Sequence, residues 1–316
     1  MPIVRLLPKS ESRTGRRHQY QARALADRLP ALCANARLAA ASMRHGVHGR
    51  RQAGIGETFW QFRPFTANEP VSLIDWRRSA KDDRLYVRER EWEAANTVMI
   101  WIDRSPSMGF SSRLALEPKV DRALVLGLAL ADLLVRGGER AGLLGLTPAL
   151  AIRQIIERFG EVLLAEERSE AYAAEELPAR TSLARGAQAV LISDFLCDPE
   201  ALALTVKALS SQGASGHLVL ISDPVEESFP FAGHVEFVDV DSGARLRLGR
   251  AEHLRETYRQ RLMQHREAIA AIARNAGWSV LIHRTDRPAT EALLALRTKL
   301  ESPAAFDLPQ RRKATN

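Results

Sequence analysis

From residue 97 onward, short continuous apolar runs alternate with longer stretches of helical periodicity. The apolar runs predict strands at 97–102, 141–146, 189–193, 217–222, 235–240 and 278–283. The periodic stretches predict helices at 119–136, 152–170, 199–212, 252–276 and 288–300. Apolar strands separated by helices form mainly parallel sheets that are covered on both faces. We therefore predict a doubly wound α/β domain over residues 97–300.

The residues before this domain follow two other patterns. Residues 18–44 have helical content and spacing, broken near Pro30, so we assign residues 1–44 to a basic helical N-terminal arm. In residues 45–96, the pieces TFWQFRPF and LYVRERE alternate as strands do, which predicts a small β-rich subdomain.

Two further features complete this division of the chain. Inside the β-rich subdomain, we expect Trp76 to be a buried aromatic anchor and Asp75 to pair with Arg77, Arg78 or Lys81. Residues 301–316 follow the last predicted helix, and we expect them to form a flexible C-terminal tail.

The positive charge of the chain belongs to the arm. The whole sequence has a net charge of +7, but residues 1–50 hold ten Arg or Lys and only two Asp or Glu. Such an arm can bind nucleic acid or an anionic surface. Tyr20 is the only aromatic residue there that could stack on a base, so we favour a solvated helix over nucleic-acid binding.

The sequence also indicates where the protein works. The longest apolar run, residues 124–135, has 12 residues and contains Asp132, which is too short and too charged for a membrane span. The first residues carry charges where a signal peptide needs an apolar core. Cys33 and Cys197 lie far apart and have no metal-type spacing, so we expect reduced thiols in a cytoplasmic protein.

Candidate chemistry follows the predicted strands. Asp103, Asp194 and Asp223 each come directly after one, and ligands of such sheets bind beyond the carboxyl ends of the strands. Asp223 precedes a proline, which is typical of a turn, so we leave it out of the site.

Asp103 begins a pattern of oxygen donors at alternate positions, with Ser105 and Ser107. One carboxylate and two hydroxyls suit a hard divalent cation such as Mg²⁺, which takes oxygen ligands and keeps some of its waters. The alternative is a polar turn, in which Asp and Ser accept hydrogen bonds from free backbone N–H groups at a helix start.

The pattern resembles the metal-ion-dependent adhesion site (MIDAS) of von Willebrand factor A domains. Over most of residues 45–300 the chain resembles the bacterial domain-of-unknown-function family fifty-eight. The stretches that carry this resemblance are HGRRQAGIGETFWQFRPF, IDWRRSAKDDRLYVRERE, DRSPSM, LISDF, SDPVEESFPF, LRETYRQRLMQH and GWSVLIHRTD. The family has a von Willebrand factor A-like α/β fold and is associated with MoxR-type AAA+ ATPases.

The resemblance implies a metal site with five members. Asp103, Ser105 and Ser107 match its first loop, and Asp194 matches an aspartate that reaches the metal through water. A threonine completes the site, and Thr181 is the candidate, with Ser182 as the alternative. Only residues 182–188 separate Thr181 from the next predicted strand, which is shorter than the family pattern.

Together these features favour a non-enzymatic, metal-dependent protein-interaction module. It is expected to bind Mg²⁺ and the acidic residue of a client protein, and the resemblance implies a MoxR-type ATPase as its partner. Two alternatives remain open: a Mg²⁺-dependent phosphoester hydrolase, and a nucleic-acid or membrane-surface adaptor that uses the basic arm. The sequence contains no HExxH, no GxxxxGK[ST] and no GxSxG, which argues against a zinc hydrolase, P-loop ATP binding and an α/β-hydrolase esterase.

Overall fold

The computed structural model describes most of the chain, and it divides into two compact units: residues 47–96, and the rest. The residues described are 14–43, 52–54, 58–66, 69–81, 84–92, 96–169, 172, 174–179, 181, 183–211, 213–238 and 244–301. The predicted tail lies outside them, except for Glu301 at the end of the last helix.

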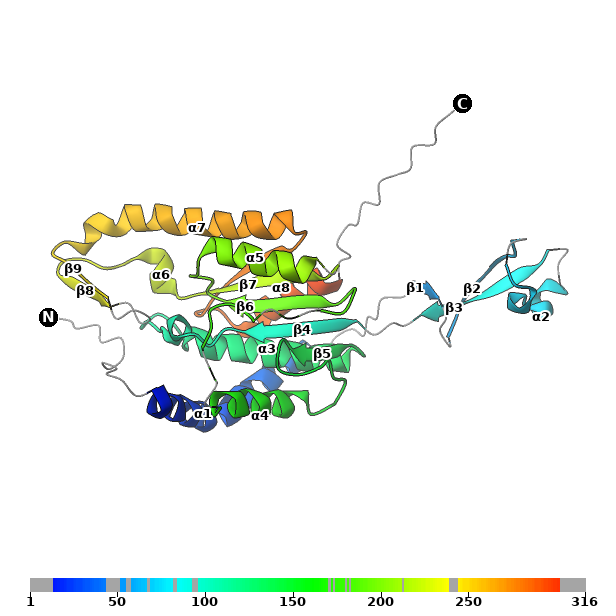
Figure 1. Ribbon diagram of the computed structural model, residues 1–316, viewed down its shortest axis with the longest axis horizontal. Helices are drawn as coiled ribbons and strands as arrows, with labels where there is room; N and C mark the ends of the chain where they lie inside the picture. Colours follow the sequence, from blue (N-terminus) through cyan, green and yellow to red (C-terminus); the bar gives the residue numbers. More distant parts are fainter. Residues whose placement is uncertain are drawn as a thin grey trace, which may run out of the picture. The chain divides into compact units, whose positions relative to one another are not determined.

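The larger unit is built on a parallel five-stranded sheet in the order β10-β7-β6-β4-β5. Its strands are β4 (Thr97–Ile102), β5 (Arg140–Leu143), β6 (Gln188–Ser193), β7 (Ser215–Ser222) and β10 (Ser279–Arg284). Strands β7, β6, β4 and β5 are labelled in Figure 1. The chain runs from β4 outward to β5 and then returns to the other side of β4 to form β6. This reversal of direction is the topological switch of a doubly wound sheet, so the predicted fold class is confirmed.

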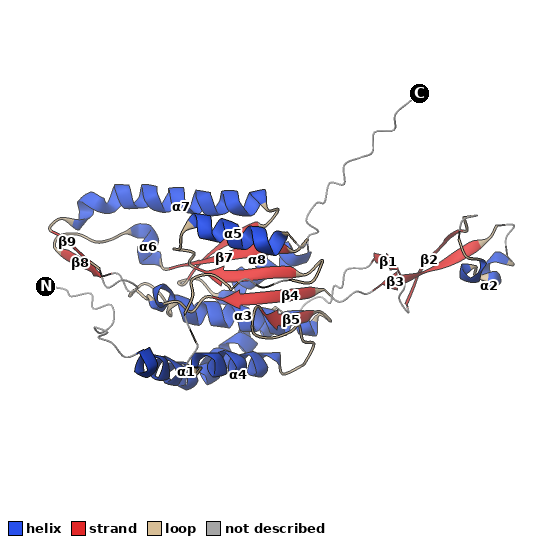
Figure 2. Cartoon of the chain, viewed as in Figure 1, coloured by secondary structure: helices blue, strands red, loops and turns tan. Residues whose placement is uncertain are grey.

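Helices cover both faces of the sheet (Figure 2). The helices that belong to the two layers are α1 (Thr14–Ser42), α3 (Lys119–Arg136), α4 (Ile155–Glu167), α5 (Pro199–Ser210), α7 (Arg255–Asn275) and α8 (Ala289–Glu301). Alternate strand residues point to opposite faces, so Val190 and Ile192 of β6 pack with α1, α3, α4 and α8, whereas Ala189 and Leu191 pack with α5 and α7. The central helix α3 ends where predicted, with Gly137 as its C-cap and Gly138 at a φ of 84°.

The N-terminal helix is part of this core. It is one continuous helix through Pro30, whereas we predicted a break there. The proline removes one backbone hydrogen bond, but Leu25 before it and Leu32 and Ala36 after it are all buried in the core. Arg28 Nη1 also lies 2.6 Å from Asp121 Oδ1 of α3, so tertiary contacts hold both halves in line.

One predicted strand of the sheet lies elsewhere. The run at 235–240 forms β8 (Val235–Val238), which pairs antiparallel with β9 (Arg245–Leu248) as a separate hairpin. All four β8 residues are only partly buried, so this strand lacks the two covered faces of a central parallel strand. Phe237 instead stacks on Phe229, which follows the short helix α6 (Pro224–Ser228).

The smaller unit contains a three-stranded antiparallel sheet in the order β1-β3-β2. Its elements are β1 (Gln52–Gly54), β2 (Thr58–Pro64), the 3-10 helix η1 (Val71–Leu73), α2 (Trp76–Ser79) and β3 (Tyr86–Trp92). Trp76 is 60% exposed, so our prediction of a buried anchor was wrong. Asp75 accepts a hydrogen bond from the backbone N–H of Arg78 at 3.0 Å, because it caps α2.

Within the described ranges, none of the helices combines the length and the apolar character that crossing a bilayer requires. The 12-residue apolar run lies inside α3, which packs against the sheet in the core.

Two buried histidines predict how stability changes with pH. Burial lowers the pKa of His217 and that of His283 to about 4, so both stay neutral in the fold. Unfolding releases them to an ordinary pKa near 6.5, so the unfolded state binds more protons between these values. We expect each histidine to destabilise the protein increasingly as the pH falls from about 6.5 to 4, by on the order of 3 kcal/mol at full effect.

Chemical denaturation of the wild type and of His283→Gln at several pH values measures this contribution. The variant is expected to lose less stability than the wild type between pH 6.5 and 4. The comparison between the two proteins is needed because buried acids such as Asp103, whose pKa is raised to about 6, act in the opposite direction. Parallel curves for the two proteins would contradict the prediction.

Candidate metal site at the sheet switch point

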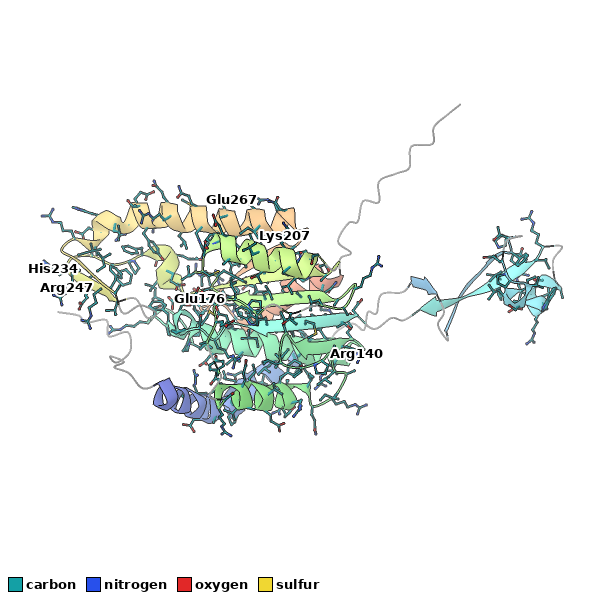
Figure 3. The ribbon with its side chains drawn as sticks, viewed as in Figure 1. Arg140, Glu176, Lys207, His234, Arg247 and Glu267 are labelled. Carbon is teal, nitrogen blue, oxygen red and sulfur yellow. The ribbon has the colours of Figure 1, made fainter. Side chains whose placement is uncertain are left out.

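The predicted residues Asp103 and Asp194 lie at the switch point of the sheet. They follow the adjacent strands β4 and β6, and the backbone N–H of Asp103 donates to Ile192 O at 2.9 Å. In Figure 3 the labelled Glu176 lies at this end of the sheet, and Arg140, the first residue of β5, lies at the opposite end. The connections after β4 and β6 lead to α3 and α5 on opposite faces of the sheet. Doubly wound sheets bind their ligands at such a point.

Asp103 is 1% exposed, and two neighbours hold its carboxylate in place. Its Oδ1 accepts a hydrogen bond from the backbone N–H of Ser105 at 2.7 Å, and its Oδ2 accepts one from Ser193 Oγ at 2.6 Å. Burial raises the pKa of Asp103 to about 6; the hydrogen bonds from Ser193 and Ser105 oppose this rise, and the charge of Asp194 adds to it. A carboxylate that is costly to keep ionised is one that a bound cation stabilises.

Ser105 and Ser107 bring their hydroxyls together beside this carboxylate. Ser105 has extended backbone and precedes the 3-10 helix η2 (Pro106–Gly109), in which Ser107 is the second residue. The two Oγ atoms lie 3.1 Å apart, and the Ser105 side chain helps to lower the pKa of the neighbouring Asp103 carboxyl. The structure therefore gathers the three first-loop residues into one group of oxygens.

Asp194 is engaged by a residue that the sequence analysis missed. Its Oδ2 accepts a hydrogen bond from Lys119 Nζ at 2.7 Å, and its Oδ1 accepts one from the backbone N–H of Leu196 at 3.1 Å. Lys119 is the first residue of α3 and is 1% exposed. Its ammonium also donates to Glu226 Oε1 of α6 at 2.6 Å.

The charge of Lys119 is maintained by these two acids. Burial alone lowers the pKa of an ammonium, but Asp194 and Glu226 outweigh it and raise the pKa of Lys119. A lysine at a helix N-terminus is also opposed by the helix dipole. That conflict was the one signal in the sequence that Lys119 has a specific partner.

Thr181 does not join this group in the described contacts. Its hydroxyl donates to Ala179 O at 3.2 Å, and it lines a hollow of about 230 Å³ together with Ala201 and Leu204 of α5. The alternative, Ser182, lies outside the described residues. The membership of Thr181 in a metal site therefore stays a prediction that no contact supports.

Asp223 is the N-cap of the short helix α6, where we predicted a turn. Its carboxylate caps α6 by accepting the N–H of Val225 at 2.8 Å, and Glu226 completes a capping box by accepting the N–H of Asp223. Its second oxygen accepts the N–H of Ser112 at 2.8 Å, which ties the segment after η2 to the sheet.

Arg104 stands between Asp103 and Ser105 in the sequence, but its side chain contacts α4 and not these oxygen donors. It pairs with Glu166 and Glu167 of α4 and lies 5.1 Å from the ring centroid of Tyr172. Together with Trp101 and Tyr172 it lines a hollow of about 360 Å³ near the ends of β4 and β5.

The donor set decides which metal could fit. Among the described residues, no group of three or more His, Cys, Asp or Glu is arranged to hold a metal ion. The convergent donors are instead one carboxylate and two hydroxyls, all of them oxygens. They fit a hard cation such as Mg²⁺ that retains several waters, and they do not fit a soft metal.

Comparison with known proteins identifies the family. Residues 61–268 match the family described as protein of unknown function DUF58. The chain belongs to the DUF58 family. The match covers β4, η2, α3, β6 and α6, so every residue of the candidate site lies within the DUF58 region. No curated protein and no solved structure gave a significant match.

Ser193 supplies a test of how Asp103 is positioned. Its Oγ donates to Asp103 Oδ2 and accepts the backbone N–H of Phe195 at 2.8 Å, and Phe195 has a left-handed φ of 49°. Ser193→Ala leaves both groups buried without this partner, so we expect a loss of about 1–3 kcal/mol in the free energy of unfolding. Ser211→Ala, at the exposed end of α5, is the control and is expected to change stability by less than about 0.5 kcal/mol. Equal stability of the two variants in urea denaturation would rule out this positioning role.

Proposed function

We propose that this protein is a non-enzymatic, metal-dependent protein-interaction module. Asp103, Ser105 and Ser107 hold Mg²⁺ at the switch point of the sheet, and an Asp or Glu of a client protein supplies a further ligand. The observation that carries the proposal is the convergence of these three oxygen-bearing side chains, with Ser105 and Ser107 Oγ 3.1 Å apart beside the buried carboxylate.

The charge balance supports binding of an acidic client. Asp103 is the one carboxylate in the convergent set, and Asp194 is already paired with the ammonium of Lys119. A divalent cation held by a single net negative charge keeps an excess of positive charge. An incoming carboxylate neutralises that charge and replaces a metal-bound water.

The same ion pairs weigh against a phosphoester hydrolase. Such an enzyme needs a carboxylate or histidine that is free to take a proton from the attacking water. Asp194 and Glu226, which lie in the same ion-pair cluster, are both paired with Lys119. We therefore favour binding over catalysis at this site.

The basic helix supports an adaptor function less well than its composition suggests. Arg28 and Arg37 are paired with Asp121 and Glu157, and the helix packs against α3 and α4. Their charges are thus used within the fold.

The proposed partner rests on the family resemblance, and the proposed compartment rests on the two cysteines. A MoxR-type AAA+ ATPase is proposed from the family resemblance, with remodelling or maturation of a protein complex as the joint task. Cys33 and Cys197 are both free and buried, which suits the reducing cytoplasm that we propose for the protein.

Removal of the carboxylate tests the proposal. We expect Asp103→Ala to weaken Mg²⁺ binding, measured by calorimetry, by at least about tenfold, because the variant lacks the charged ligand. Binding of a purified MoxR-type ATPase or of an acidic client is expected to require Mg²⁺ and to be lost in EDTA. Circular dichroism checks that the variant is folded.

The matched control is Asp27→Ala, which removes an exposed carboxylate from α1 and is expected to behave as the wild type. Partner binding that persists in EDTA, or that Asp103→Ala leaves intact, contradicts the proposed mechanism. Turnover of a phosphoester that disappears in Asp103→Ala would instead favour the hydrolase.

A further inference from the structure

We propose that Lys119 is a built-in cation of the site and that it competes with the divalent metal for Asp194. The inference rests on the proposed metal site and adds the residue that sets its affinity. In this arrangement the metal binds weakly while Lys119 stays in place, and Asp194 becomes a ligand only when the ammonium leaves it.

The first support is the position of the ammonium. Lys119 Nζ lies 2.7 Å from Asp194 Oδ2 and 2.6 Å from Glu226 Oε1, with its side chain 1% exposed. A buried ammonium is tolerated only where acids compensate its desolvation, so these two contacts define its place. The ammonium is therefore paired with Asp194, the residue that the family resemblance implies reaches the metal through water.

The second support is that Asp194 lies close enough to Asp103 to interact electrostatically with a cation bound there. Ser193, the residue before it, donates directly to Asp103 Oδ2, and the charge of Asp194 contributes to the raised pKa of Asp103. A cation beside Asp103 therefore interacts electrostatically with Asp194. Lys119 cancels much of that attraction and adds repulsion of its own.

The third support is that both oxygens of Asp194 already have partners. Oδ1 accepts the Leu196 N–H and Oδ2 accepts the Lys119 ammonium. Phe110, whose ring centroid lies 5.7 Å from Lys119 Nζ, adds a further favourable contact for the ammonium. Recruitment of Asp194 by a metal thus requires the loss of an ion pair, and this cost lowers the affinity of the site.

Removal of the ammonium tests the inference. Lys119→Met keeps an unbranched side chain that is one atom shorter and deletes its charge, so we expect Mg²⁺ and Mn²⁺ to bind about tenfold more tightly. The same change at Lys207, which is exposed on α5, is the matched control because it alters the net charge equally (Figure 3). Calorimetry gives the affinities, and electron paramagnetic resonance reports bound Mn²⁺ independently.

A double-mutant cycle shows whether Asp194 is the residue released. In the wild type, Asp194→Asn is expected to change the metal affinity by less than about threefold, because Lys119 already neutralises the carboxylate. In the Lys119→Met background, the same substitution is expected to abolish the gain. Thermal melting shows whether Lys119→Met folds. If it does not, the double variant Lys119→Met/Glu226→Gln, in which Asp194 is the single unpaired acid, replaces it in the cycle.

The outcomes separate this inference from the proposed function. Metal binding that depends on Asp103 but is unchanged by Lys119→Met overturns the competition and leaves the metal site standing. An equal gain in Lys207→Met also overturns it, since the effect is then one of net charge. Absence of metal binding in every protein overturns the site itself, and the inference with it.

Discussion

The parallel pairing of β4 with β6 is the constraint on which the site depends. The two strands are neighbours in the sheet although η2, α3, β5 and α4 separate them in the sequence. Their register places Ser193 within hydrogen-bond distance of Asp103, and Asp194 is the next residue along the chain. Without this pairing, the residues after β4 would be a capped turn with no second strand to complete a site.

The burial that stabilises this sheet also determines the electrostatics at its end. Helices on both faces exclude water from β4 and β6, and the same exclusion makes an ionised Asp103 costly and requires partners for Lys119. Asp194 and Glu226 provide those partners, and Glu226 is itself fixed by the capping box of α6. The site is therefore linked through one lysine to the start of α3, the end of β6 and α6.

Differences between prediction and structure have a common origin in packing. The segment at 235–240 has the composition of a buried strand, yet β8 lies in a hairpin against an aromatic cluster. Pro30 is a helix breaker by local rules, but α1 continues through it because the residues on both sides pack into the core. Trp76 is exposed although it is aromatic, whereas Ser79 of the same short helix is buried.

The sequence by itself determined the order of strands and helices, the doubly wound class and the oxygen-donor group of Asp103, Ser105 and Ser107. These features depend on hydrophobic periodicity and on residues one or two positions apart, which local geometry brings together. Only the tertiary structure decided that Lys119 neutralises Asp194 and that Thr181 lines a hollow beside α5. Lys119 and Asp194 are 75 residues apart, and a contact at that separation is fixed by how helices pack on the sheet, which no local pattern encodes.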